Sequence, residues 1–387
     1  MKKKIAILGS TGSIGKTLLN IIEKDRQNFE IVLLAANKNH KLLLKQAKKY
    51  NVKNLIISNL KSYKHIIKNK KKLKIKVFNN FNYFNKIFKK KIDYSMSAIT
   101  GIDGLIPTLK IIKYTKNIAI ANKESIICGW SLIKKELKLN NTFFVPVDSE
   151  HFSIWYGLKN NIDQIDRIYL TASGGPFIDM PKNKFKKISV KQALNHPNWK
   201  MGKKISIDSA TMMNKVFEII EAKNIFNVNY NQLSILTHPK SYVHAIIKFN
   251  NGLIKFIAHD TDMRIPIFNS LYSASDLKNM KSSKINLNNL NNLNLNDVEI
   301  KKFPLIKILS QIPKKNSLFE TILVTANDEL VNLFLRGQIN FLDISKRLLS
   351  IVNSQEFEKY KFISPKNVDQ ILKLNKYVSL KINPKSI

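Results

Sequence analysis

The sequence contains a single cysteine, Cys128, in 387 residues. One cysteine excludes a disulfide framework and any zinc site built from several thiolates, and it is typical of a reducing compartment. We therefore expect a cytoplasmic protein. Long apolar runs are also missing, because the longest are of strand length and fall short of the ~20 residues of a membrane helix. The basic start "MKKK" precedes only four apolar residues, so we expect neither an export signal nor a membrane partner.

Acidic residues are scarce, since 27 Asp and Glu stand against 65 Lys and Arg, for a formal net charge of +38. One interpretation of such a charge is that the protein binds nucleic acid. Only five of the basic residues are arginines, however, although bidentate contacts to phosphate and guanine favour arginine. Lys, Asn and Ile abound along the whole chain, as an AT-rich coding sequence produces without selection for a ligand. We therefore expect no nucleic-acid partner, and a basic surface would also help to gather anionic small substrates.

Apolar runs of strand length alternate with helical patterns from residue 3 to 147: "KIAIL", "IVLLAAN", "VKNLIIS", "IKVFN", "YSMSAI", "NIAIA" and "TFFVPV". This rhythm predicts an α/β fold whose N-terminal domain, 1–148, is a Rossmann-like parallel sheet. The strand-like runs "RIYLTA", "ISID", "LSILTH", "VHAIIKF" and "LIKFIAH" predict a central α+β catalytic domain, 149–275. An Asn-, Lys- and Ser-rich stretch, 276–300, reads as a linker, and 301–387 as a C-terminal helical domain.

A glycine-rich turn follows the first predicted strand and opens the first predicted helix in "ILGSTGSIGKTLLN", with Gly9, Gly12 and Gly15. Glycines in this context let the backbone approach a pyrophosphate at a helix N-terminus. The alternatives are a nucleoside triphosphate loop and a plain tight turn. The triphosphate loop is disfavoured because five residues separate Gly9 from Gly15, where that motif has four.

The end of the second predicted strand indicates which dinucleotide is bound. Enzymes that use NAD place an acid there for the ribose 2′-hydroxyl. The sequence reads "AANKNH", without an acid and with Lys38 between Asn37 and Asn39. These residues would accept a 2′-phosphate, so we expect NADPH.

Two carboxylates, Asp148 and Glu150, flank a serine after the last strand of the first domain, in "VPVDSEHFS". In an extended segment both would point to the same side and could share one cation. The helical stretch "DSATMMNKVFEIIEA" adds Glu218, with Asn214 and Lys215 on adjoining positions. Three carboxylates suit a hard ion, Mg²⁺ or Mn²⁺. The alternative for Lys215 and Glu218 is an exposed ion pair.

Hydroxyl, amide and ammonium donors that would suit a phosphate monoester come from two further motifs and this helix: Ser173, Ser209, Asn214 and Lys215. The loop "NHPNWKMGKK" contains His196 and Trp199 and is too polar for the core. We interpret it as a lid over the substrate, with an ordinary loop carrying a half-buried Trp as the alternative. Serine is common in turns, so for each serine taken singly a structural role is the favoured interpretation.

These motifs together identify a family resemblance. The segments "GSTGSIG", "ANKES", "PVDSEH", "SGGPF", "HPNWKMG", "DSATMMNK" and "DMR" make the chain similar, over essentially its whole length, to the 1-deoxy-D-xylulose 5-phosphate reductoisomerase family of the non-mevalonate isoprenoid pathway. The resemblance implies a cytoplasmic homodimer that uses NADPH and Mg²⁺ or Mn²⁺, with Co²⁺ a further candidate. It would convert 1-deoxy-D-xylulose 5-phosphate into 2-C-methyl-D-erythritol 4-phosphate.

The resemblance also implies roles for matching residues. Those for NADPH are Thr11, Gly12, Ser13, Ile14, Asn37, Lys38, Asn39, Asn122, Glu124 and Gly202. Those for the metal are Asp148, Glu150 and Glu218. Those for the substrate are Lys123, Ser149, Glu150, Ser173, His196, Trp199, Ser209, Asn214, Lys215 and Glu218, of which Lys123 and His196 join the metal ligands as catalytic residues.

Three alternatives remain open on the sequence. The first is another two-domain NADPH oxidoreductase, resembling a semialdehyde dehydrogenase, with Cys128 as nucleophile. The second is a basic nucleic-acid-binding protein. The third is a low-activity copy of the reductoisomerase, because Val216 is larger than the residue usual in the family beside the phosphate donors.

Overall fold

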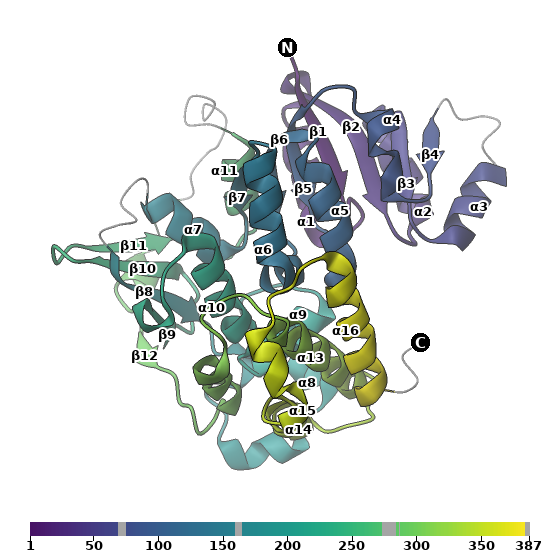
Figure 1. The fold of residues 1–387 in the computed structure, drawn as a ribbon. Coiled ribbons are helices and arrows are strands. Elements are labelled where there is room, and N and C mark those ends of the chain that lie inside the picture. Colours follow the sequence, from purple (N-terminus) through teal and green to yellow (C-terminus); the bar gives the residue numbers. More distant parts are fainter. Residues whose placement is uncertain (69–74, 159–164, 273–283, 286, 384–387) are drawn as a thin grey trace. The chain divides into compact units, whose positions relative to one another are not determined.

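The computed structural model describes residues 1–68, 75–158, 165–272, 284–285 and 287–383, and the chain divides into two compact units (Figure 1). Unit 1 comprises Met1–Ile126, Ser131–Asp148 and the described part of 263–280. Unit 2 comprises Ile127–Trp130, the described part of 149–262, and that of 281–387. Compact units are not folding domains, so the domain boundaries expected from the sequence stay a prediction. Residues 276–283 and 286 of the expected linker lie outside the described residues.

The sheet of unit 1 has seven parallel strands, in the order β4-β3-β2-β1-β5-β6-β7. All seven expected runs are strands: β1 Lys3–Leu8, β2 Phe29–Ala36, β3 Asn54–Ile57, β4 Lys76–Phe78, β5 Ile92–Ser97, β6 Thr115–Ile120 and β7 Phe143–Pro146. The order runs outward in both directions from β1 and β5, which makes their carboxyl ends the switch point where ligands bind in such sheets. The predicted α/β fold class is confirmed.

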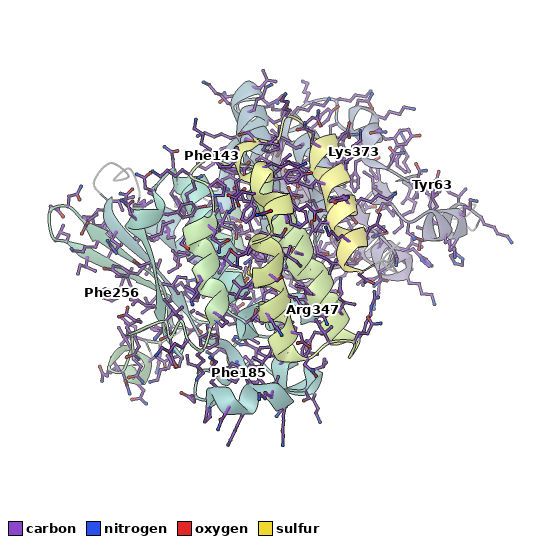
Figure 2. The ribbon with its side chains drawn as sticks, turned by 60° about the horizontal axis from the view of Figure 1, so that its bottom comes forward. Tyr63, Phe143, Phe185, Phe256, Arg347 and Lys373 are labelled. Carbon is purple, nitrogen blue, oxygen red and sulfur yellow. The ribbon has the colours of Figure 1, made fainter. Side chains whose placement is uncertain are left out.

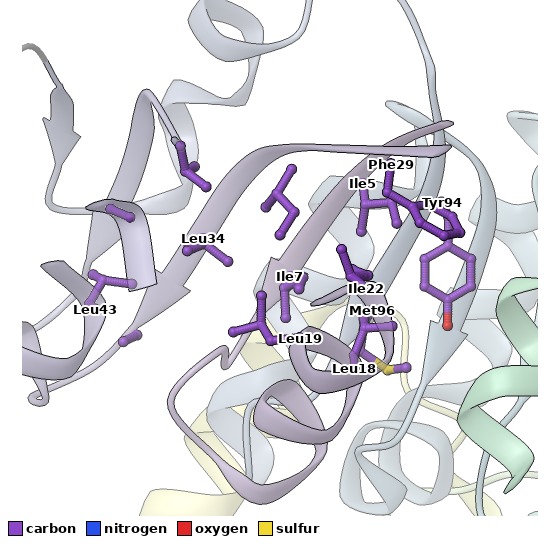
Figure 3. Close-up of a cluster of buried hydrophobic side chains, with 14 of the residues drawn as sticks. Ile5, Ile7, Leu18, Leu19, Ile22, Phe29, Leu34, Leu43, Tyr94 and Met96 are labelled. Carbon is purple, nitrogen blue, oxygen red and sulfur yellow. The ribbon is translucent and has the colours of Figure 1, made fainter. Parts of the chain in front are cut away.

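Helices alternate with these strands along the chain: α1 Ser13–Glu23, α2 His40–Lys49, α3 Leu60–Lys68, α4 Phe84–Ile87, α5 Leu105–Ile112 and α6 Lys123–Leu139, with α11 Arg264–Leu271 joining from later in the sequence. The central strands are buried on both faces because helices cover them, and Ile5 and Ile7 are fully buried. Figure 3 shows both side chains in one cluster with Leu18, Leu19 and Ile22 of α1. This cluster fixes α1, and hence the glycine turn that precedes it.

Unit 2 contains a mixed sheet in the order β11-β10-β8-β9-β12. The strands are β8 Ile165–Ala172, β9 Leu233–Thr237, β10 Val243–Phe249, β11 Ile254–Ala258 and β12 Asn296–Asp297. Two helices pack on it, α7 Ser149–Leu158 and α10 Met213–Phe226. Ile154 of α7 and Ile219 of α10 share a buried cluster with Ile168 and Ile247 of the sheet. This packing sets α7 and α10 against each other, and both carry predicted site residues.

The remaining helices of unit 2 are α8 Val190–Leu194, α9 Lys203–Ala210, α12 Leu287–Leu290, α13 Phe319–Leu335, α14 Phe341–Val352, α15 Gln355–Glu358 and α16 Val368–Ile382. The buried helix α13 packs against α9, α14 and α16. The helical character expected for 301–387 therefore holds. Within the described part of the chain, every helix is too short or too polar to cross a bilayer.

The prediction that "ISID" forms a strand was wrong, because these residues lie inside α9. Their alternation of apolar and polar residues has the period of a strand, but tertiary contacts override it. Ile207 and Ala210, three residues apart, are both buried, and Ser206 donates a hydrogen bond from Oγ to the Gly202 carbonyl one turn earlier. Ser209, expected just before a helix, also lies inside α9, and Met212, with φ +63°, separates α9 from α10.

Candidate active site

Two of the predicted metal ligands converge on one ammonium group inside unit 2. Glu150 lies in the first turn of α7, and Lys215 and Glu218 lie on α10. The Nζ atom of Lys215 is 2.8 Å from Oε1 of Glu150 and also pairs with Glu218. The side chains of Lys215 and Glu218 are only 4% and 2% exposed, so the alternative of an exposed ion pair is excluded. Burial lowers the pKa of Lys215, but the charges of Glu150 and Glu218 outweigh it and raise that pKa above its ordinary value.

The third predicted ligand, Asp148, is held at the start of α7 by its peptide bond to Ser149. Asp148 is the last residue of its segment of unit 1, and Glu150 and Glu218 belong to unit 2. The expectation of an extended segment was wrong, because a helix begins at Ser149, after β7 has ended at Pro146. Each of the three acids still offers hard carboxylate oxygens, and Glu150 and Glu218 already attract the Lys215 ammonium. They fit Mg²⁺ or Mn²⁺.

Two predicted substrate donors are hydrogen-bonded to these carboxylates in the structure. Ser149 donates from Oγ to Oε2 of Glu150 at 2.6 Å, and Asn214 donates from Nδ2 to Oε1 of Glu218. Lys123 belongs to unit 1, where its Nζ lies 3.1 Å from Oδ2 of Asp148. Each of these donors therefore contacts a predicted metal ligand.

Sequence reasoning missed His151, a fully buried residue of α7. Its Nε2 lies 2.9 Å from the backbone carbonyl oxygen of Glu218, so the imidazole ties α7 to α10 between two predicted ligands. Glu221, also on α10, is buried as well. The signal was available, because His151 follows Glu150 directly and Glu221 lies one helical turn after Glu218.

His196 brings two predicted phosphate donors together. Its Nε2 lies 3.0 Å from Oγ of Ser173 and 3.1 Å from Oγ of Ser209. Its Nδ1 accepts hydrogen bonds from the backbone N–H groups of Asn198 and Trp199, at 3.2 and 3.0 Å. Burial lowers the pKa of His196 to about 4, so the ring is neutral at neutral pH. Since Nδ1 accepts, the one ring proton is on Nε2.

This tautomer determines what the two serines can do. The Nε2–H group of His196 is directed at both hydroxyl oxygens, and the Gly175 N–H donates a further hydrogen bond to Oγ of Ser173 at 3.1 Å. Oxygens that accept these bonds keep their own hydroxyl protons to donate. Ser173 and Ser209 are therefore oriented as donors to an anionic oxygen.

The two glycines after Ser173 allow a close approach of backbones. Gly174 and Gly175 have φ of +77° and +65°, a region that side chains with a Cβ rarely adopt. A Cβ on Gly175 would lie 2.9 Å from the carbonyl oxygen of Ser209. The close approach at this turn therefore limits how far apart Ser173 and Ser209 can lie.

The predicted lid loop makes both polar and aromatic contacts with the rest of unit 2. Asn198 donates from Nδ2 to the Pro239 carbonyl at 2.5 Å and to Oγ of Ser241 at 3.1 Å. The half-buried Trp199 ring meets the ring of His244 edge to face, with centroids 6.0 Å apart. The half-buried Trp is thus observed, and opening and closing of the loop stays a prediction.

The glycine turn of unit 1 has the geometry of an anion cradle. Gly9 has φ +88°, and a Cβ there would lie 2.4 Å from the carbonyl oxygen of Ala98, just after β5. No side chain caps α1, whose N-cap residue is Gly12. The N–H groups of the first turn thus face the switch point with the positive end of the helix dipole, as a pyrophosphate requires. The turn also contains Thr11, Ser13 and Ile14.

A cavity of about 630 Å³ lies at the carboxyl ends of β2 and β3, lined by Asn37, Lys38, Ser58, Asn59, Leu60, Lys61 and Ser62. Its lining contains two lysines and no acid, which fits a 2′-phosphate and disfavours an enzyme specific for NAD. The segment 58–62 was missed by sequence reasoning, although it follows a predicted strand. Asn39 caps α2 by accepting a hydrogen bond from the Leu42 N–H at 3.2 Å.

Three other predicted cofactor residues have local structural roles. Asn122 caps α6, accepting from the Ser125 N–H at 2.6 Å, and donates to the Gly101 carbonyl at 2.8 Å. Glu124 is buried in the first turn of α6. Gly202, in unit 2, is the N-cap of α9, and a Cβ there would meet open space.

Cys128 is fully buried in α6, with its Sγ 3.9 Å from the backbone oxygen of Glu320. A nucleophile must meet its substrate, so this burial disfavours a dehydrogenase that acts through Cys128.

The doubly wound sheet, the glycine turn and the phosphate-accepting cavity define the class of protein as an NADPH-dependent oxidoreductase. Family models agree in detail. The model for 1-deoxy-D-xylulose 5-phosphate reductoisomerase matches residues 5–129, and two models for C-terminal domains of the same enzyme match 144–226 and 259–379. The chain belongs to the 1-deoxy-D-xylulose 5-phosphate reductoisomerase family.

Named relatives and solved structures agree with this assignment. The chain is 62% identical over 388 residues to the 1-deoxy-D-xylulose 5-phosphate reductoisomerase of Pelagibacter ubique, covering 100% of both chains. It is 38% identical to that of Wolbachia pipientis from Culex pipiens, over 94% and 92% of the two chains.

Among solved structures, the Zymomonas mobilis enzyme in complex with NADPH matches with a TM-score of 0.87 and 28% identity, over 100% of both chains. A reductoisomerase in complex with NADPH, fosmidomycin and magnesium matches with a TM-score of 0.90 and 29% identity, over 99% and 98%. Family membership decides against the semialdehyde-dehydrogenase-like and nucleic-acid-binding alternatives.

Proposed function

We propose that this chain carries out the NADPH- and divalent-metal-dependent rearrangement and reduction of 1-deoxy-D-xylulose 5-phosphate to 2-C-methyl-D-erythritol 4-phosphate, a step of isoprenoid precursor synthesis. The observation that carries the proposal is the buried convergence of Glu150 and Glu218 on Lys215. Burying two carboxylates is costly unless a cation compensates them. This arrangement suits a site that exchanges cations and polar substrate oxygens.

Asp148, Glu150 and Glu218 would hold the metal. A bound Mg²⁺ or Mn²⁺ supplies Lewis-acid polarisation of the ketone and neighbouring hydroxyl oxygens, and relatives solved with magnesium and NADPH support both cofactors. Ser149 and Asn214, which already contact the carboxylates, would hydrogen-bond the oxygens of a substrate bound beside them. Lys123, which pairs with Asp148, would bind the same substrate as a further cation.

The phosphate of the substrate would be held by Ser173, Ser209, Asn214 and Lys215. The neutral His196 keeps both serine hydroxyls directed as donors. A phosphate oxygen meeting several such donors in a partly buried site is bound in one orientation, which positions the carbon skeleton for reaction. Trp199 in the lid loop would cover the substrate and exclude water from the aldehyde that must be reduced.

The nicotinamide of NADPH supplies the hydride when bound. We assign its pyrophosphate to the turn formed by Thr11, Gly12, Ser13 and Ile14, and its 2′-phosphate to Asn37, Lys38 and Asn39. Asn122, Glu124 and Gly202 complete the expected cofactor set, as the family resemblance implies.

We also propose a homodimer in the cytoplasm. The strand β11 is the edge of its sheet and pairs only with β10 among the described strands. It exposes Ile254 and Phe256 by 51% and 50%, beside Leu253 at 63%. Figure 2 labels Phe256 on this strand. An unpaired edge with exposed apolar side chains favours pairing with the same strand of a second copy. The cytoplasmic location rests on the single, buried cysteine.

The test measures NADPH consumption by its absorbance, with 1-deoxy-D-xylulose 5-phosphate and Mg²⁺ or Mn²⁺. EDTA should abolish turnover, and Glu150→Gln and Glu218→Gln should each lower kcat/KM at least about a hundredfold, because each removes a metal ligand. Glu299→Gln, at an exposed acid, is the control and should not change the rate. NADPH binding without turnover by the native chain would indicate another substrate, and absence of NADPH binding would refute the proposal.

A further inference from the structure

A buried carboxylate that the reaction does not use lies one residue before Ser209. Asp208, in α9, is only 1% exposed. Its Oδ1 accepts a hydrogen bond at 2.7 Å from Nδ2 of Asn327, a fully buried residue of α13. Its Oδ2 lies 3.0 Å from Nζ of Lys204, one turn earlier in α9, and the same Nζ lies 3.0 Å from Oδ1 of Asp328 on α13. Two side chains of α13 thus hold the end of α9.

The location of this contact gives it a consequence for the phosphate donors. Asp208 is covalently next to Ser209, and the turn that follows is tight. Thr211 donates from Oγ1 to the Asp208 carbonyl at 3.2 Å, and the Met212 N–H donates to the Ser209 carbonyl at 3.1 Å. Gly175 leaves no room for a Cβ against Ser209. A shift of α9 along α13 would therefore move the Ser209 hydroxyl out of reach of its partners.

A binding site built from several short hydrogen bonds is sensitive to such a shift, since a displacement of about 1 Å in a positioned group can cost a large factor in rate or affinity. The carboxylate of Asp208 meets the Asn327 amide and the Lys204 ammonium in this interior. Replacing the amide with an apolar group would leave the carboxylate with one fewer donor and would favour rearrangement of the end of α9.

We propose that Asn327 and Lys204 are positioning residues, which act through Asp208 to hold Ser209 in the phosphate-binding set. The inference rests on the proposed function, because that function assigns Ser209 to the phosphate. It gives the C-terminal helix α13 a role in substrate affinity. Asn327 touches neither substrate nor cofactor in this proposal.

The experiment compares Asn327→Leu with Asn375→Leu in the full-length chain. Asn375 is a matched control, because it also donates a hydrogen bond to α13, from Nδ2 to Oγ1 of Thr325 at 2.7 Å, and has no contact with Asp208. Inorganic phosphate is the probe, titrated by calorimetry at constant ionic strength so that the net charge of +38 contributes equally to every variant.

Asn327→Leu should weaken phosphate binding about tenfold or more, and should raise KM for the phosphorylated substrate by a similar factor with little change in kcat, as loss of uniform binding does. A purely structural defect would lower the active fraction, and with it the apparent kcat, and leave both the phosphate Kd and KM unchanged. The double variant Asp208→Asn with Asn327→Asp exchanges the amide and the carboxylate and should recover phosphate affinity relative to Asn327→Leu.

Equal phosphate affinity in the native chain and Asn327→Leu would overturn the inference, and so would an equal loss in Asn375→Leu. Absence of phosphate binding by the native chain would overturn it together with the assignment of Ser209. Phosphate binding that depends on Asn327, in a native chain that does not consume NADPH, would support the inference while the proposed function failed.

Discussion

Glu320 provides a prediction of pH-dependent stability with a magnitude that follows from the structure. It lies in the first turn of α13 and is 1% exposed. Its Oε2 accepts hydrogen bonds from the N–H and Oγ of Ser317, at 3.1 and 2.5 Å, just before the helix begins. Burial raises the pKa of Glu320 to about 7, and the hydrogen bonds from Ser317 only partly oppose it.

The sign and size of the effect follow from proton linkage. The ordinary pKa of the group is 4.5. Between pH 4.5 and about 7 the native chain keeps a proton that the unfolded chain has released, so the free energy of unfolding falls as the pH rises. Each unit of pKa difference corresponds to about 1.4 kcal/mol. Above pH 7 the buried, ionised Glu320 therefore costs the native state about 3 kcal/mol, relative to its protonated form below pH 4.5.

The perturbation is Glu320→Gln, which keeps an acceptor for the hydrogen bonds from Ser317 and removes the ionisation. In urea titrations the variant should exceed the native chain in free energy of unfolding by up to about 3 kcal/mol near pH 8, and should match it within about 0.5 kcal/mol near pH 4. Glu358→Gln, at an exposed acid, controls for the change in net charge. The same difference at both pH values, or a variant that is less stable near pH 8, would refute the reasoning.

Three further substitutions test the cofactor site and the dimer. Lys38→Glu should raise KM for NADPH at least about tenfold and improve the relative use of NADH, because it sets a carboxylate in the cavity assigned to the 2′-phosphate; unchanged kcat/KM values for both cofactors would contradict this. Gly9→Ala would place a Cβ 2.4 Å from the Ala98 carbonyl oxygen at a left-handed φ, so fluorescence titration should show lost NADPH affinity. Phe256→Lys should shift the sedimentation coefficient from dimer to monomer, and an unchanged value would exclude β11 as the interface.

The strands of unit 1 could be predicted because their pattern of apolar residues can be read from short stretches of sequence. Strands buried on both faces must be apolar at nearly every position, and helices between them carry the period of 3.6 residues. Ile5, Ile7, Leu33 and Leu34 are all fully buried, so "KIAIL" and "IVLLAAN" could be read directly as strands. The glycine turn could be predicted as well, because it lies between the first of these strands and the helix that follows.

Elements whose conformation depends on distant residues were not predictable in the same way. The stretch "ISID" alternates like a strand, and its helical state depends on contacts such as that of Asp208 with Asn327, 119 residues later in the sequence. The segment at Asp148 and Glu150 reads as extended, yet α7 begins there and packs on β10. Local propensity decides between such alternatives only weakly when tertiary contacts differ by several kcal/mol.

The sequence predicted which residues form the candidate site, but not how deeply their side chains are buried. The sequence shows that Lys215 and Glu218 share a helix face, and this spacing most often marks an exposed pair. Burial alone distinguishes the two cases, and burial of α10 follows from its packing on β8 and β9. The sequence also could not show which ring nitrogen of His196 carries the proton. Two backbone N–H groups donate to Nδ1, and only the folded loop directs them there.

Because acidic residues are scarce in this chain, the few that are buried are informative. A carboxylate leaves water only where donors or cations replace its hydration. Glu218 meets this requirement with the Lys215 ammonium and Asp208 with an amide and an ammonium. Glu320 accepts hydrogen bonds from the neutral donors of Ser317, and burial raises its pKa to about 7. The partners therefore differ in kind: an ammonium lies against Glu218 and Asp208, which can serve a cation or position a neighbour, whereas burial makes Glu320 an acid whose ionisation destabilises the fold.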